Sequence, residues 1–376
     1  MAPGVLSQRA LNRALLERQH LLRRRRASAA SEIEHLVAMQ AQVPNAPYVG
    51  LWSRLEVFQP NELSDLITTR RAVRLGLLRN TVHLVAAGDS LELRPLFQPL
   101  FERELKTTHF GRNLVGLDLR PVIARAITLM EERPRTFSEL GKLLQQRWPD
   151  RDANSLAYAI RYLVPIVQVP PRGIWGKRAQ PAWAPAEHWL GRPVATKPSV
   201  EKLVLRYLAA FGPAAISDVS AWSGLTALRD TFERLRKQVR TFRDERGREL
   251  FDVPDGPLPD PDTPAPPRFL PEYDNLLIGH DDRTRVIHFE YRHSIFMGTL
   301  LVDGFVQATW AVKRTKDAAV LTIEPLRRLT KGERVAVGEE GERLLVFVAG
   351  DAAGRDVRIT PVASSPPRPP QFPHRE

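Results

Sequence analysis

Two stretches in the middle of the chain repeat one order of elements at a spacing of about 80 residues. In the first stretch, the spacing of apolar residues predicts helices near 122–130, 137–144 and 152–163. Thr136 and Glu139 form a capping box for the second helix, and Asp152 opens the third. A strand pair from Ile166 to Trp183 follows. Three helices and then a two-stranded wing form a winged helix, so the repeat predicts tandem winged helices.

The second stretch repeats this order and ends in a hairpin from Val239 to Val253, which turns at Arg246-Gly247-Arg248. Its helices are predicted near 200–211, 214–223 and 226–237. The N-terminal part fits the same plan loosely, with one extra helix and a strand pair that turns at Arg79-Asn80. The elements predicted there are helices near 8–25, 32–40, 46–58 and 61–70 and strands between Ala72 and Ala87.

After a proline-rich connector, β-type stretches dominate the C-terminal part of the chain. These stretches are Arg285–Phe289, Thr299–Val302, Phe305–Val312, Val320–Pro325 and Leu344–Val348. The expected fold class is α+β, with three tandem winged-helix domains and a small mostly-β C-terminal unit. The expected divisions are winged helices at 1–115, 116–196 and 197–256, a linker at 257–268, the β-rich unit at 269–362 and a disordered tail at 363–376.

Gln40-Ala41-Gln42 places two carboxamides around one small residue, with Pro44 just beyond. In a helix, residues two apart point about 200° apart, whereas in extended backbone they point the same way. Pro44 disfavours helical geometry at Val43, so we expect a helix from residue 32 to end near Gln40 and to leave the pair extended. Ser31 and Glu34 have the form of a capping box for that helix. The pair could hold one water, although glutamines at a helix end are often simply solvated.

The 55 basic and 43 acidic side chains give a net charge of +12, which favours nucleic acid or another polyanion as partner. The absence of cysteine excludes disulfides, thiolate metal sites and a cysteine nucleophile. No apolar run is long enough for a membrane span, and the N-terminus lacks a signal-peptide core. We therefore expect a cytoplasmic protein that does not contact a membrane. No metal ligand set or phosphate-binding glycine loop is evident, so no cofactor is expected.

Basic side chains occur where wings and recognition helices would meet a DNA backbone, although each one alone could equally be a solvated arginine. The candidates in the second and third predicted domains are Arg172, Lys177, Arg178, Arg229 and Arg246. Winged helices also serve as protein-interaction modules, so a scaffold without DNA affinity is one alternative. A DNA-binding regulator that does no chemistry is another, although regulators usually dimerise on a palindrome and three unlike winged helices in one chain favour a monomer.

Several blocks of sequence together resemble a family of bacterial winged-helix DNA glycosylases of the AlkZ and YcaQ type. The blocks are Gln40–Pro44, Leu51–Arg54, Arg70–Arg74, Leu78–Val85, Leu270–Arg283 and Leu301–Trp310. They occur in family order and the resemblance covers about residues 5 to 350. The family motif is Gln-x-Gln in the AlkZ type and Gln-x-Asp in the YcaQ type, and Gln40 and Gln42 match the first form.

The resemblance implies a monofunctional DNA glycosylase with Gln40 and Gln42 as catalytic residues, acting on N7-alkylated guanine in double-stranded DNA and on crosslinks joined through guanine N7. We expect further DNA contacts within or near the matching blocks, from Arg54, Arg79, His83, His280, Arg283, Arg285 and His293. Two alternatives stay open. His83 could pack or bond within the first wing, and Tyr273, Asp274 and Asp281 could fix their own loop. Trp52 and Trp310 are expected in core or interdomain contacts rather than under a base.

Overall fold

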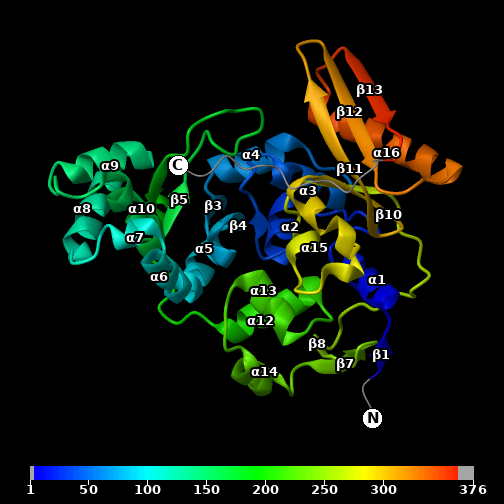
Figure 1. Ribbon diagram of the computed structural model, residues 1–376, viewed down its shortest axis with the longest axis horizontal. Coiled ribbons are helices and arrows are strands. Elements are labelled where there is room, and N and C mark those ends of the chain that lie inside the picture. Colours follow the sequence, from blue (N-terminus) through cyan, green and yellow to red (C-terminus); the bar gives the residue numbers. More distant parts are fainter. Residues whose placement is uncertain (1–3, 363–376) are drawn as a thin grey trace.

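The computed structural model describes residues 4–362, so the predicted tail at 363–376 lies outside the described residues. Helices and strands alternate along the chain in a mixed α+β fold (Figure 1). Helices α8–α10 form one end of the molecule, and strands β11–β13 with helix α16 project at the other (Figure 1). None of the helices within 4–362 is long and apolar enough to cross a membrane.

The N-terminal segment follows the predicted order. Its main elements are β1 (Val5–Leu6), α1 (Gln8–Arg18), α2 (Ala29–His35), β2 (Met39–Gln40), α3 (Ala46–Arg54), α4 (Pro60–Thr68), β3 (Ala72–Gly76), η1 (Leu78–Asn80), β4 (Val82–Ala86), α5 (Ala87–Leu93), η2 (Arg94–Phe97), α6 (Gln98–Thr107) and α7 (His109–Arg112). Three details of the prediction are wrong. The helices predicted near 8–25 and 46–58 end earlier, at Arg18 and Arg54. Helix α2 begins at Ala29, because the Ser28 side chain accepts from the amide of Ser31, so Ser31 and Glu34 form no capping box. The helix also ends at His35, because Val37 is left-handed with φ 67.

The two repeated stretches form the predicted helices and strand pairs. The first contains α8 (Leu119–Glu132), α9 (Phe137–Gln145), α10 (Ala153–Leu163), β5 (Ile166–Gln168), β6 (Trp183–Pro185) and α11 (Ala186–Leu190). The second contains α12 (Val200–Phe211), α13 (Ile216–Ser223), α14 (Arg229–Leu235), β7 (Arg240–Asp244) and β8 (Glu249–Asp252). The capping box of Thr136 and Glu139 and the cap by Asp152 are both confirmed.

The strands of the first two segments join in one five-stranded sheet of order β2-β4-β3-β5-β6. Strand β3 links them by pairing with β4 on one side and with β5 on the other, antiparallel in both cases. The third segment is tied to the N-terminus instead, because β1 pairs in parallel with β7. The main cluster of buried apolar side chains also runs through all three segments. The predicted units are therefore joined by shared sheets and by a shared core.

The C-terminal part forms a second five-stranded sheet, of order β13-β12-β11-β10-β9, which packs on α16 through a separate apolar cluster. Its elements are β9 (Arg268–Leu270), α15 (Asn275–Ile278), η3 (Arg283–Arg285), η4 (Phe289–Phe296), β10 (Gly298–Val302), β11 (Phe305–Arg314), β12 (Ala318–Pro325), α16 (Lys331–Ala349) and β13 (Gly354–Ile359). Three predicted strands are confirmed. The strand predicted at Arg285–Phe289 is wrong, since 3₁₀ turns occupy that region. The strand predicted at Leu344–Val348 lies within α16, which a capping box at Thr330 begins.

Candidate active site

The glutamine motif lies at the edge of the first sheet. Gln40 belongs to β2 and pairs with His83 of β4, and the amide of Ala41 donates to the carbonyl of Val82 at 2.8 Å. Gln42 follows at a bend and is exposed, whereas Gln40 is only 9% exposed. The backbone is therefore extended at Gln40, where the sequence predicted the end of a helix. The two carboxamides belong to one short segment but have different surroundings.

Two side chains from distant parts of the sequence hold this segment in place. Asn275 of α15 donates from Nδ2 to the carbonyl of Ala38 at 2.5 Å and accepts the amide of Gln40 at Oδ1 at 3.4 Å. Arg74 of β3 donates from Nη2 to the carbonyl of Ala41 at 2.7 Å. Asn275 thus holds the backbone at Ala38 and Gln40, and Arg74 holds it at Ala41. Together these bonds restrict the movement of the segment.

Arg54 supports the same segment indirectly, and the prediction that it contacts DNA is wrong. Its side chain is fully buried and forms a bidentate ion pair with Asp274 at 2.7 and 2.9 Å. Asp274 in turn caps α15 by accepting from the amide of Leu276. Asn275 is the first residue of that helix, so the ion pair between Arg54 and Asp274 also fixes the position of Asn275, which bonds to β2. The expectation that Asp274 stabilises its own loop is confirmed.

Arg79 contacts the motif directly. It lies in the turn between β3 and β4 with φ 50, and its Nη2 donates to Oε1 of Gln40 at 3.2 Å. Its Nη1 donates to the carbonyl of Trp222, at the end of α13. Burial, and then the charge of nearby Arg283, lower the pKa of Arg79 to about 10, so it stays protonated at neutral pH. Of the predicted DNA contacts, this one therefore reaches the glutamine motif itself.

Three further predicted DNA contacts are buried, and these predictions are wrong. His83 is bonded to the carbonyl of Thr81 at 2.9 Å, as the packing alternative proposed, and His280 is bonded to the carbonyl of Phe211 at 3.0 Å. Burial lowers the pKa of both histidines to about 3, so neither adds positive charge at neutral pH. Arg285 is also buried and donates to the carbonyl of Pro213.

A groove of about 620 Å³ begins where the motif ends. Val43, Asn45 and Ala46 form one part of its wall. The turn that carries Lys177 and Arg178 forms another part, and both of these side chains are exposed. The remaining lining residues include Val49, Trp175, Glu272, Trp310, Val312, Arg314 and Val348. Burial raises the pKa of the Glu272 carboxyl. The groove thus combines an apolar floor with basic side chains on its rim.

The other candidate basic residues are dispersed. Arg172 is half-buried and donates to the carbonyl of Ala179. Arg229 is exposed at the start of α14. Arg283 and His293 are partly exposed, on η3 and η4. Trp310 donates from its indole nitrogen to the carbonyls of Leu270 and Thr299, as expected for a tryptophan in packing contacts.

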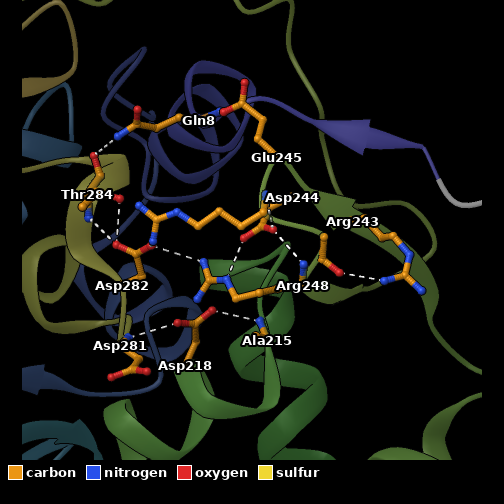
Figure 2. A network of polar contacts seen from close by, with 12 residues as sticks. Gln8, Ala215, Asp218, Arg243, Asp244, Glu245, Arg248, Asp281, Asp282 and Thr284 are labelled. Atoms are coloured by element: carbon orange, nitrogen blue, oxygen red, sulfur yellow. Dashed lines mark hydrogen bonds and ion pairs between the residues drawn. The ribbon is translucent and has the colours of Figure 1, made fainter.

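Figure 2 shows a network of charged side chains around the turn between β7 and β8, which includes Asp244, Arg248 and Asp282. Arg246 belongs to the same network. Asp282 pairs with Arg246 at 3.1 Å and with Arg248 at 3.4 Å, and Asp244 pairs with Arg248 at 2.6 Å. Asp218 accepts the amides of Asp281 and Ala215 (Figure 2). The network ties the β7–β8 hairpin to the loop that precedes Arg283. Asp281 contributes its backbone amide to this network, and the role expected for its side chain stays a prediction.

Arg74 and Asn275 were not singled out as site residues from the sequence. Arg74 gave a usable signal, because an arginine between Val73 and Leu75 in a buried strand needs buried acceptors. Asn275 gave none, since its partners Ala38 and Gln40 lie more than two hundred residues away in sequence. Within residues 4–362, no three His, Asp or Glu side chains gather as a metal site would require.

Comparison with known proteins identifies the family of this chain. A search of curated proteins finds no match. Among solved structures, the DNA glycosylase AlkZ of Streptomyces sahachiroi superimposes with a TM-score of 0.75 at 19% identity, covering 95% of this chain and 100% of that one. The family model for DNA glycosylases of the AlkZ-like type matches residues 33–347, which includes the glutamine motif, Arg79 and Asn275. On this match, the chain belongs to the AlkZ-like family of DNA glycosylases and is a DNA N-glycosylase.

Proposed function

We propose that this glycosylase hydrolyses the N-glycosidic bond of N7-alkylated guanine in duplex DNA, with Gln40 and Gln42 holding the attacking water. The observation that carries the proposal is the pair of carboxamides on a segment whose backbone is bonded to Asn275 and Arg74. A carboxamide does not take up a proton at neutral pH, so neither glutamine serves as a general base. Both can orient a water by hydrogen bonds, which is catalysis by positioning.

The chemistry of the substrate fits such a site. Alkylation at N7 makes the guanine cationic, so the base leaves as a neutral molecule without being protonated. When the bond between C1′ and N9 breaks, its electron pair goes to the purine and neutralises that charge. The water oxygen bonds to C1′, and the water gives up one proton to solvent. An unmodified base is a poorer leaving group and is left in place. Selectivity then follows from reactivity as well as from fit.

The groove beside the motif suits duplex DNA better than a flipped base. Many glycosylases extrude the target nucleotide into a snug pocket, which a crosslinked base cannot enter. Here the exposed Gln42 is followed by residues that line a groove with the exposed cations Lys177 and Arg178 at its rim. These cations would neutralise phosphates on either side of the lesion. We therefore include the unhooking of crosslinks through guanine N7 in the proposed function.

The three helical segments would contact the duplex as winged helices, with divisions at 1–115, 116–196 and 197–256 and with one chain sufficient for binding. The shared sheets and the shared core support a single self-contained clamp. Sedimentation of the protein with a short duplex tests this part. A complex of one chain with one duplex is expected, and a 2:1 complex would contradict it.

Base release from a duplex that carries one N7-methylguanine tests the proposed reaction. The parent chain should release 7-methylguanine, and the Gln40→Ala, Gln42→Ala double variant should be slower by about 100-fold or more, because it no longer positions the water. Gln146→Ala, at an exposed glutamine after α9, is the matched control and should behave as the parent. Equal rates for the parent and the double variant would refute the assignment. A second duplex, crosslinked through two guanine N7 atoms, tests unhooking separately.

A further inference from the structure

Arg79 connects the catalytic motif to another segment of the protein. One end of its guanidinium bonds to Oε1 of Gln40 at 3.2 Å, and the other bonds to the carbonyl of Trp222. Gly224, just after α13, packs against the same turn, since a side chain there would come within 3.4 Å of the Arg79 Cα. The end of α13 therefore sets the position of Arg79, and Arg79 reaches from there to Gln40.

The bond to Arg79 determines which way the Gln40 carboxamide faces. A guanidinium has only hydrogen-bond donors, so the atom that meets it must be the amide oxygen rather than the nitrogen. Within the described chain, Nε2 of Gln40 has no protein acceptor, and it is not among the buried side-chain nitrogens that lack a partner. Nε2 therefore reaches solvent on the side of the carboxamide away from Arg79.

We propose that Arg79 is a positioning residue that fixes Gln40 as a hydrogen-bond donor toward the DNA, which leaves Gln42 as the acceptor that holds the water. This inference rests on the proposed function and divides its chemistry between the two glutamines. Gln42 is exposed and, among residues 4–362, has no protein partner for its carboxamide, so it can turn its oxygen to the water. Gln40 cannot do so without breaking its bond to Arg79.

The charge of Arg79 strengthens this arrangement. Its acceptors are a carboxamide and a backbone carbonyl, and no carboxylate pairs with it in the described residues. An uncompensated cation at the oxygen of an amide draws electrons toward that oxygen and makes the N–H groups of the amide better donors. Gln40 is thus prepared to bond an electron-rich atom of the nucleotide, such as a sugar or phosphate oxygen.

Carboxylate variants of the two glutamines test the division of roles. Gln40→Glu keeps an oxygen for Arg79 but has no N–H to donate, so base release should fall by about 100-fold, the usual loss for one donor aimed at a transition state. Gln42→Glu keeps an acceptor for the water and should retain base release within about 10-fold of the parent. The reverse order, or equal losses in both variants, would overturn the proposal.

Variants of Arg79 test whether it acts through Gln40. In Arg79→Met, the single-turnover rate at saturating protein should fall by about 10-fold or more, with affinity for undamaged duplex changed less than about threefold. Arg79→Lys keeps a charged donor and should recover part of the rate, and it also serves if the methionine variant does not fold. Arg120→Met, at a side chain 90% exposed on α8, loses the same charge and should match the parent. Weaker binding with an unchanged rate would identify Arg79 as a phosphate contact instead.

A measurement without substrate separates this inference from the proposed function. The side-chain NH₂ signals of Gln40 can be assigned by their loss in Gln40→Met. In the parent they should be shifted from those of a solvated glutamine, and in Arg79→Met they should move toward solvated values, while the signals of Gln42 stay unchanged. Signals of Gln40 that do not respond to Arg79→Met would refute the positioning role. Absence of base release in the parent, with this response present, would refute only the proposed reaction.

Discussion

Arginines lie close to two short β elements of this protein, the glutamine motif and the β7–β8 hairpin. The arginines at the two places differ in whether a carboxylate pairs with them. At the hairpin, Arg248 pairs with Asp244 and Asp282 (Figure 2), and Arg246 also pairs with Asp282. At the motif, Arg74 and Arg79 bond only to amide and carbonyl oxygens in the described chain. Burial, and then the nearby Arg172, lower the pKa of Arg74 to about 10, as burial and Arg283 do for Arg79.

The difference shows where the protein keeps positive charge available. A buried cation without a counter-ion costs free energy that an ion pair would recover in part. Retaining two such cations beside Gln40 and Ala41 gives that region an attraction for an incoming polyanion, whereas the charges of Arg246 and Arg248 are already paired with carboxylates. Net charge along the sequence does not reveal this, because the segment that carries Gln40 and Gln42 has no arginine of its own and receives Arg74 and Arg79 from β3 and the turn that follows it.

The largest expected effect comes from breaking the ion pair behind the motif. Arg54→Met leaves the carboxylate of Asp274 buried without its partner, which should lower the free energy of unfolding by about 3–5 kcal/mol, as measured by urea denaturation. Adding Asp274→Asn removes that charge and keeps a capping side chain for α15, so the double variant should recover part of the loss. A single variant as stable as the parent would show that the pair does not hold α15.

Substitution of Arg74 should have a small effect on stability and a larger effect on the rate of base release. Arg74→Met removes a buried cation that has no carboxylate partner, so the free energy of unfolding should change by less than about 1.5 kcal/mol. The rate of base release should nevertheless fall by about 10-fold, because the carbonyl of Ala41 loses its bond and the motif moves. Urea denaturation and single-turnover kinetics on the same sample measure both. A large loss of stability with a normal rate would reverse the comparison.

Salt dependence distinguishes free from neutralised cations. Lys177→Ala removes an exposed charge at the rim of the groove, so the slope of log Kd against log salt should fall by about 1. Arg246→Ala removes a charge that is paired with Asp282, so the slope should change by less than about half as much. Fluorescence anisotropy with an undamaged duplex at several salt concentrations measures both slopes. Equal changes would mean that DNA displaces Asp282 from Arg246.

Glu272 should contribute the smallest effect, as a pH dependence of binding. Burial raises the pKa of this carboxyl, so it gains its proton at a higher pH than an exposed glutamate, and DNA phosphates in the groove would raise the pKa further. Binding then takes up a proton, and affinity should increase up to about threefold as the pH falls through the raised pKa. Glu272→Gln should remove this dependence, and Glu131→Gln, at an exposed glutamate of α8, should keep it.

Local signals in the sequence predicted most of the helices and strands. Thr136 and Asp152 identified two helix starts, because a cap acts through residues three positions away. The β-type residues at Leu344–Val348 lie in α16 instead of a strand, because the capping box at Thr330 begins a helix that continues through them. Ser31 does not cap α2, because Ser28, three residues earlier, caps it instead.

The candidate site was predictable in its two glutamines and much less so in their surroundings. Motif and spacing single out Gln40 and Gln42, and their catalytic role stays a prediction. The role of Arg54 depends on Asp274, and the neutral state of His83 and His280 depends on burial, neither of which appears in the local sequence. A basic residue in a matching block can serve the fold as readily as the ligand, and only tertiary contacts decide between the two.

The hydrogen bonds from Asn275 to Ala38 and Gln40 have a consequence for the synthesis of the protein. A ribosome makes Gln40 and Gln42 early, but the side chain that bonds to Ala38 and Gln40 is added 235 residues after Gln40. Until then, a nascent chain carries both glutamines without the partner that aligns their strand. A product that terminates before Asp274 would keep the motif and lose its alignment. The order of translation therefore makes the bonds from Asn275 to β2 one of the later steps in assembling this site.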